Sequence, residues 1–151
     1  MTTTSGAGHT TSSRSPLRLG ATVVGAGFLL VGLLGFVPGI TSNFDELGFA
    51  GPESEALLLG LFQVSVLHNI VHLLFGVAGL ALARRADTAR LYLLAGGAIY
   101  LVLFLFGLVI DMDSAANFVP LNGADNILHL GLGVGMIALG YLLGRSTADR
   151  H

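Results

Sequence analysis

The feature that most constrains this sequence is a set of four long apolar runs without proline or any residue that is charged at neutral pH. The runs are Leu19–Val37, Ala56–Ala83, Leu91–Ile110 and about Asn126–Gly144. A run of about 20 apolar residues forms a helix long enough to cross the ~30 Å hydrocarbon core of a bilayer. The sequence therefore predicts four transmembrane helices within residues 17–144.

Composition agrees with a membrane protein. Charged residues make up 11% of the chain, against about 25% in an average soluble domain, and the mean hydropathy is +0.80. Seven arginines, no lysine and a net charge of −2 do not provide the basic surface that nucleic-acid binding requires. The absence of cysteine excludes disulfides, thiol catalysis and iron–sulfur clusters. We therefore expect the lipid bilayer to be the main partner.

The first two runs each allow more than one interpretation. Leu19–Val37 exceeds the about 7–15 apolar residues of a signal peptide and is followed by Pro38, so we predict an uncleaved helix, with a cleaved signal as the alternative. Ala56–Ala83 has 28 residues, which would make a helix roughly 42 Å long. Such a helix must tilt or project from the ~30 Å core.

Basic and acidic residues are separated along the chain. The seven arginines lie at or before the start of the first run, in the turn 84–90, or after the fourth run, whereas segments 38–55 and 111–125 carry only acidic charges. The positive-inside rule then places both termini and the turn in the cytoplasm. We predict a multi-pass protein of the bacterial inner membrane with a disordered cytoplasmic tail at 1–16 and a second tail at 145–151.

The second and fourth runs contain similar segments. Residues 69–77 and 126–134 share the pattern N-I-x-H-L-x-x-G-V, with six identities in nine positions. We therefore predict an all-α, four-helix bundle made of two repeated transmembrane hairpins, with the second and fourth helices turned toward each other. Glycines on these two helices allow close packing of neighbouring helices. The predicted helix-packing residues are Gly76, Gly79, Gly133 and Gly140.

The same two segments carry a family resemblance. The block L-H-N-x-x-H-L-x-x-G at residues 67–76 and the block D-N-x-L-H at residues 125–129 resemble a bacterial membrane family, domain of unknown function 4383. The likeness covers about residues 17–144. It implies a small four-helix inner-membrane protein and no established activity.

Six polar residues of the second and fourth runs form the candidate site. They are His68, Asn69, His72, Asp125, Asn126 and His129. His68 and His72 are four residues apart and share one helix face, and so do Asp125 and His129. Polar side chains within a membrane are costly and tend to face the bundle interior, where they find partners. We therefore expect these six residues to form one polar cluster in the outer half of the membrane.

Four interpretations of this cluster are open, and the leading one is structural. In it, each His–Asn pair hydrogen-bonds to its counterpart on the other helix and fixes the register of the bundle. The second interpretation is transport or sensing of a proton or a small solute, because histidine titrates near neutral pH. Four short helices leave little room for a path, so transport would require a homo-oligomer.

The other two interpretations involve cofactors. Haem b could be held between His72 and His129, because opposed histidines on two helices supply axial ligands. A divalent metal could be bound by His68, His72, Asp125 and His129, because imidazole and carboxylate at this spacing are metal ligands. Neither cofactor is the leading prediction. No nucleophile elbow, P-loop or dinucleotide fingerprint is present, so we expect a non-enzymatic role.

Overall fold

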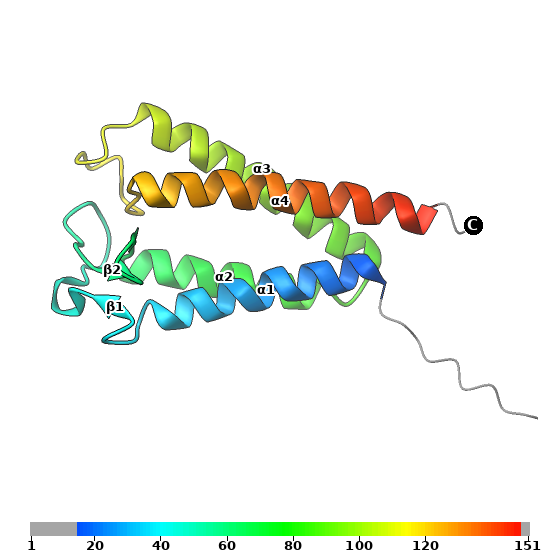
Figure 1. Cartoon of the computed structure of the whole chain (residues 1–151), viewed down its shortest axis with the longest axis horizontal. Helices are drawn as coiled ribbons and strands as arrows, with labels where there is room; N and C mark the ends of the chain where they lie inside the picture. Colours follow the sequence, from blue (N-terminus) through cyan, green and yellow to red (C-terminus); the bar gives the residue numbers. More distant parts are fainter. Residues whose placement is uncertain (1–14, 149–151) are drawn as a thin grey trace, which may run out of the picture.

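The computed structural model describes residues 15–148, which form four helices and a small antiparallel sheet (Figure 1). The helices are α1 (Pro16–Leu34), α2 (Val66–Leu82), α3 (Ala86–Val109) and α4 (Gly123–Ala148). The strands β1 (Thr41–Ser42), β2 (Leu57–Leu58) and β3 (Phe62–Gln63), together with a short 3-10 helix (Phe44–Glu46), lie between α1 and α2. We call the end of the bundle that carries the sheet the sheet end, and the opposite end the turn end.

Most of the two predicted tails lies outside the described residues, and the described parts are helical except for Ser15, which caps α1. Pro16 is the first residue of α1, because the Ser15 hydroxyl accepts the Arg18 backbone N–H at 3.4 Å and proline is favoured at the first helical position. Residues 145–148 continue α4. Both helices are therefore longer at the turn end than the apolar runs alone indicate.

The prediction of one helix over residues 56–83 is wrong. Residues 57–63 form a hairpin in which Leu57 pairs with Gln63 and Leu58 with Phe62. Leu59 and Gly60, with φ of 54° and 70°, make its turn. The Ser65 hydroxyl then caps α2 by accepting the His68 backbone N–H at 3.1 Å. The fold is therefore mostly helical, with a small sheet that the sequence analysis did not predict, since a continuous apolar run can also contain a strand.

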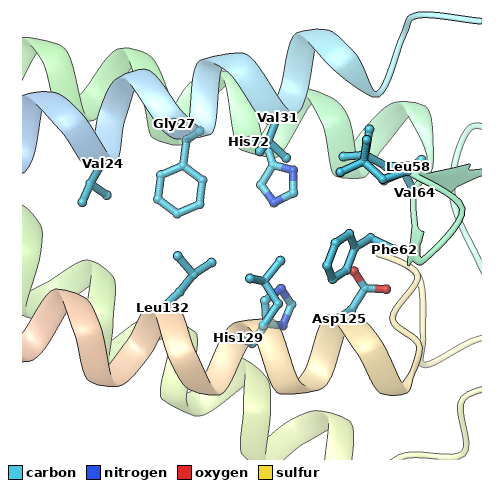
Figure 2. Close-up of a pocket in the computed structure, with 13 residues that line it drawn as sticks. Val24, Gly27, Val31, Leu58, Phe62, Val64, His72, Asp125, His129 and Leu132 are labelled. Carbon is cyan, nitrogen blue, oxygen red and sulfur yellow. The ribbon is translucent and has the colours of Figure 1, made fainter. Parts of the chain in front are cut away.

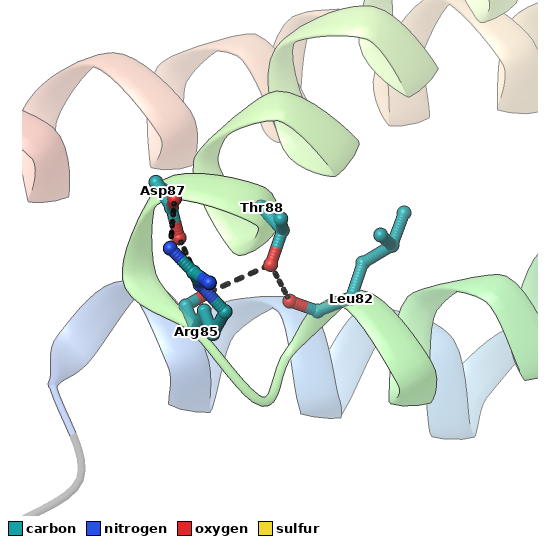
Figure 3. Close-up of polar contacts among 4 residues, drawn as sticks. All are labelled: Leu82, Arg85, Asp87 and Thr88. Carbon is teal, nitrogen blue, oxygen red and sulfur yellow. Dashed lines mark hydrogen bonds and ion pairs between the residues drawn. The ribbon is translucent and has the colours of Figure 1, made fainter.

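The turn between α2 and α3 is fixed by polar contacts (Figure 3). The Thr88 hydroxyl lies 2.6 Å from the Leu82 carbonyl and 3.2 Å from the Arg85 carbonyl, positioned to donate to either. The Arg85 guanidinium binds the Asp87 carboxylate at 3.0 Å. These contacts start α3 at Ala86, which is five residues before the predicted apolar run. The hydrophobic pattern does not include the charged residues of this first turn, although such residues are compatible with a helix.

The helices pack most closely as two pairs, α1 with α2 and α3 with α4, and the pairs contact each other less extensively (Figure 1). The expectation that α2 and α4 face each other holds for side chains at the sheet end. The buried interior between the pairs includes Phe28, Leu93, Tyr100 and Met136.

Within residues 15–148, three helices are long and apolar enough to cross a membrane, namely α1, α3 and residues 123–145 of α4, whereas α2 has only 17 residues. Large apolar side chains on the outside of the bundle are exposed by more than half, as expected for surfaces that meet lipid. Examples are Val23, Val102, Leu105, Val109, Ile127 and Leu142. The chain is thus a helical membrane protein.

Candidate functional site

The six polar residues predicted as a cluster are all buried at the sheet end, and none is more than 8% exposed. The structure brings the three imidazoles together. The ring centroids of His68 and His72 are 4.6 Å apart, and those of His68 and His129 are 6.5 Å apart. Side chains from α2 and α4 therefore meet across the space between the two helix pairs.

Two aromatic residues that the sequence analysis did not single out complete this group. Phe28 of α1 stacks on His72 at 5.8 Å, and Tyr100 of α3 contacts His129 edge to face at 5.1 Å. Phe28 and Tyr100 also stack on each other, with centroids 5.3 Å apart and planes at 14°. The sequence does contain a sign that Phe28 and Tyr100 occupy equivalent positions. They are 72 residues apart, which is also the separation between Gly25 in the first run and Gly97 in the third run.

Asp125 joins α4 to the sheet. Its Oδ2 accepts the backbone N–H groups of Gln63 in β3 at 2.9 Å and of Asn122 at 3.0 Å. Asn122 in turn accepts the backbone N–H of Asp125 at 2.9 Å. This reciprocal arrangement is a capping box at the start of α4. The carboxylate is therefore engaged by the backbone of two segments.

His68 has a position on α2 similar to that of Asp125 on α4. The backbone carbonyls of Gln63 and Pro120 face its imidazole, so this ring is directed toward the loops that precede α2 and α4. His68 and Asp125 thus form the outer layer of the cluster, next to the loop backbone. His72 and His129 lie one helical turn deeper.

The deeper layer borders a cavity of about 250 Å³ between α1, the β2–β3 hairpin and α4 (Figure 2). The His72 and His129 rings point into this space from opposite sides, and Asp125 lies at its sheet end. The remaining wall is apolar, with Val24, Val31, Leu58, Phe62, Val64 and Leu132 among its residues. Gly27 also borders the cavity, and a Cβ added there would meet no atom within 4 Å.

A smaller cavity of about 130 Å³ lies on the other side of the imidazoles. His68, His72 and His129 share its wall with Tyr100 and with apolar residues of α3 and the loop before α4. His72 and His129 line both cavities and so lie between them, whereas His68 borders only the smaller one.

Several polar atoms of the cluster have no hydrogen-bond partner within the described residues. These atoms are the Nδ1 atoms of His68, His72 and His129, both amide atoms of Asn69, and Oδ1 of Asn126. The structural interpretation expected a hydrogen bond from each His–Asn pair to its counterpart, and these atoms do not make one. A buried polar atom without a partner is costly, so this arrangement needs an explanation.

The predicted packing glycines lie in helix contacts. A Cβ added at Gly76 would be 2.8 Å from the Gly25 carbonyl oxygen, and one at Gly133 would be 3.0 Å from the Leu101 nitrogen. A Cβ at Gly79 would meet Tyr92 at 2.7 Å, and one at Gly140 would meet side chains of α3 from 2.9 Å.

The geometry also bears on the two cofactor interpretations. Among residues 15–148, no three His, Asp or Glu side chains are grouped closely enough to hold a metal ion, so the four residues considered above do not form such a site. The larger cavity, at about 250 Å³, is below the about 300–1,000 Å³ of pockets that hold drug-sized ligands. Haem is at least as large as a drug-sized ligand, so this cavity is too small to hold it.

Fold and site together define a helical membrane protein with a buried polar cluster beside an apolar cavity. The family model described as domain of unknown function (DUF4383) matches residues 18–142, and the chain belongs to this family. This match confirms the resemblance noted from the two sequence blocks. A search of the curated proteins and a search of the solved structures each found no significant match.

Proposed function

We propose that this protein binds a small, mainly apolar molecule that carries one hydrogen-bonding group, in the cavity beside His72 and His129. The observation that carries the proposal is that two imidazoles point into a cavity whose wall, apart from Asp125, is otherwise apolar. Ligand pockets typically combine apolar walls with a few polar groups that orient the ligand. This is the small-solute interpretation of the cluster, without an enzymatic step.

The different contacts made by the residues of the cluster support this proposal. Asp125 accepts two backbone N–H groups of the loops, so its role is to hold the sheet end together, and His68 does not line the cavity. His72 and His129 are not engaged in this way and face the cavity. A ligand hydroxyl or carbonyl near these rings would have polar neighbours that the apolar part of the cavity wall does not offer.

The volume sets the size of the ligand. A dry apolar cavity of about 150 Å³ accommodates benzene, so about 250 Å³ has room for one ring with a short substituent. A molecule of this kind dissolves in lipid as well as in water. Phenols are suitable probes because they combine one aromatic ring with one hydroxyl group.

The first test uses 4-fluorophenol and the protein in lipid nanodiscs, followed by ¹⁹F NMR. We expect saturable binding to the wild type and none to Leu132→Trp, which fills the cavity. His129→Leu keeps an apolar wall but removes the polar contact, so we expect binding about two- to tenfold weaker, the value of one hydrogen bond. Fluorobenzene should not discriminate between the wild type and His129→Leu.

The control is Ile127→Trp, which adds the same ring at a residue that is 74% exposed on the outside of α4. It should bind 4-fluorophenol as the wild type does. If uptake of the probe is linear and equal in all variants, the probe is only dissolving in the bilayer, and the proposal is wrong.

We also propose that the chain consists of two repeated hairpins, α1–α2 and α3–α4. Adding 72 to a residue number in α1 gives its counterpart in α3, and adding 57 does the same from α2 to α4. Contacts at the turn end support this. The Arg18 Nε donates to the Ala83 carbonyl at 3.2 Å, and its counterpart Arg90 donates to the counterpart carbonyl of Gly140 at 3.3 Å.

Contacts elsewhere along the helices follow the same rule. A Cβ at Gly25 would be 3.0 Å from the Gly76 carbonyl oxygen, and one at Gly97 would be 2.8 Å from that of Gly133. At the sheet end, Asn69 packs against Gly35 as its counterpart Asn126 packs against Gly107. Matched contacts therefore occur at both ends and in the middle of the two hairpins. The shared nine-residue sequence pattern alone does not account for all of them.

The orientation remains a proposal based on charge. At the turn end, the described residues carry Arg18, Arg84, Arg85, Arg90 and Arg145 against the single acid Asp87. The loops of the sheet end carry only acids. The positive-inside rule places the turn end, and with it both termini, in the cytoplasm of a bacterial cell.

Orientation can be tested directly because the chain has no cysteine. We expect Asp113→Cys at the sheet end to react with a membrane-impermeant maleimide in intact spheroplasts. Arg85→Cys at the turn end should react only after the membrane is permeabilised. Both positions are exposed, so the reverse labelling pattern would show that the orientation is inverted.

A further inference from the structure

A separate pocket of about 260 Å³ lies at the turn end, between the first turns of α1 and the last turn of α2. Its wall consists of Arg18, Thr22, Leu80, Ala83 and Arg84. It is on the opposite end of the bundle from the imidazole cavity, so it is independent of the function proposed above.

The cationic groups of this pocket are only partly used. Arg18 donates through Nε to the Ala83 carbonyl at 3.2 Å, and this bond orients the guanidinium, which has further N–H donors. The Thr22 hydroxyl donates to the Arg18 carbonyl of its own helix at 2.7 Å. The ion pair formed at this end within residues 15–148 joins Arg85 to Asp87, and no acidic residue belongs to the pocket wall.

The composition of the pocket wall favours an anion here. The pocket adjoins both the start of α1 and the end of α2, so the two helix dipoles oppose each other and the positive charge comes from Arg18 and Arg84. The wall also combines the two arginines with the apolar residues Leu80 and Ala83. Arginine recognises phosphate with paired N–H donors, and apolar contacts suit the glycerol and first acyl carbons of a lipid.

We propose that Arg18 and Arg84 bind a phosphate group at this pocket, supplied by an anionic phospholipid headgroup of the surrounding bilayer. Basic pockets between transmembrane helices are known to bind such headgroups. The Arg18–Ala83 bond holds one guanidinium in place, and the exposed Arg84 closes on the phosphate from the end of α2. Free inorganic phosphate offers the same chemistry, so the experiment has to separate the two sources.

The test is native mass spectrometry of the detergent-purified protein, titrated with phosphatidylglycerol, phosphatidylcholine or inorganic phosphate. An arginine that contacts the bound headgroup is expected to contribute about fivefold in affinity for anionic lipid. We therefore expect phosphatidylglycerol binding to fall about fivefold in Arg84→Gln and about 25-fold in the Arg18→Gln/Arg84→Gln double variant. Phosphatidylcholine should bind more weakly to the wild type and be little affected by either change.

The matched control is Arg145→Gln, which removes the same charge at the same end, from a side chain that contacts the Tyr141 ring at 5.3 Å. It should bind phosphatidylglycerol as the wild type does. Arg84 is exposed, so Arg84→Gln gives a result even if the double variant does not fold. If phosphatidylglycerol binding is equal in Arg84→Gln, Arg145→Gln and the wild type, the lipid site is refuted. Phosphate binding that is lost in Arg84→Gln, without lipid selectivity, would replace the lipid by free phosphate as the ligand.

Discussion

Replacing Gly76 with alanine is expected to lower the free energy of unfolding by about 3 kcal/mol, the upper end of the usual range for overpacking. The added Cβ would lie 2.7 Å from the Leu29 backbone nitrogen and 2.8 Å from the Gly25 carbonyl oxygen. These are backbone atoms of α1, so the strain is relieved only if α1 and α2 move apart. The measurement is equilibrium unfolding in detergent micelles, followed by circular dichroism.

The control for this prediction is Gly131→Ala in α4. A Cβ at Gly131 would meet no atom within 4 Å, so this change should stabilise the helix by up to about 1 kcal/mol through its effect on the unfolded chain. Equal stability of Gly76→Ala and Gly131→Ala would mean that α1 and α2 are not packed at this distance.

The second large effect is expected for Asp125→Ala, with a loss of about 3 kcal/mol. The carboxylate accepts the backbone N–H groups of Gln63 and Asn122, and removing it leaves two backbone donors without an acceptor. Each such donor costs about 1–3 kcal/mol when it is buried. Because these bonds attach β3 to α4, we also expect faster amide hydrogen exchange at Gln63.

Asp113→Ala is the matched control, because Asp113 is an exposed acid in the loop before α4. Its loss should change stability by no more than about 0.5 kcal/mol. A purely local effect of Asp125→Ala on the start of α4, without faster exchange at Gln63, would show that the carboxylate is a helix cap and not a link to the sheet.

The sequence was most informative about the helices and least informative about their ends. The apolar runs predicted each helical region because burial in lipid requires a continuous apolar surface. They failed at residues 56–65, where a hairpin has the same apolar composition as a helix. Two signals marked the true boundary, the Leu59–Gly60 turn and the Ser65 cap, but both are local and weak beside a 28-residue apolar run.

The candidate site was predicted as a set of residues but not as an arrangement. Burial of the six polar residues follows from the cost of exposing them to lipid. Sequence spacing could not show that Asp125 binds the backbone of β3, because that strand was expected to be helix. It also could not show that Phe28 and Tyr100 pack against the deeper imidazoles, since an aromatic residue in an apolar run has many alternative neighbours.

The short α2 affects how the protein fits its bilayer. Its 17 residues rise about 26 Å, a few ångströms less than a typical hydrocarbon thickness of ~30 Å. The hairpin that precedes this helix at the sheet end exposes Leu59 by 62% and Leu61 by 58%, so apolar side chains continue the lipid-facing surface beyond the first residue of the helix. Because hydrophobic mismatch costs fractions of a kcal/mol per ångström, we expect these leucines to cover the few ångströms that α2 lacks, so that the surrounding membrane need not thin on this side.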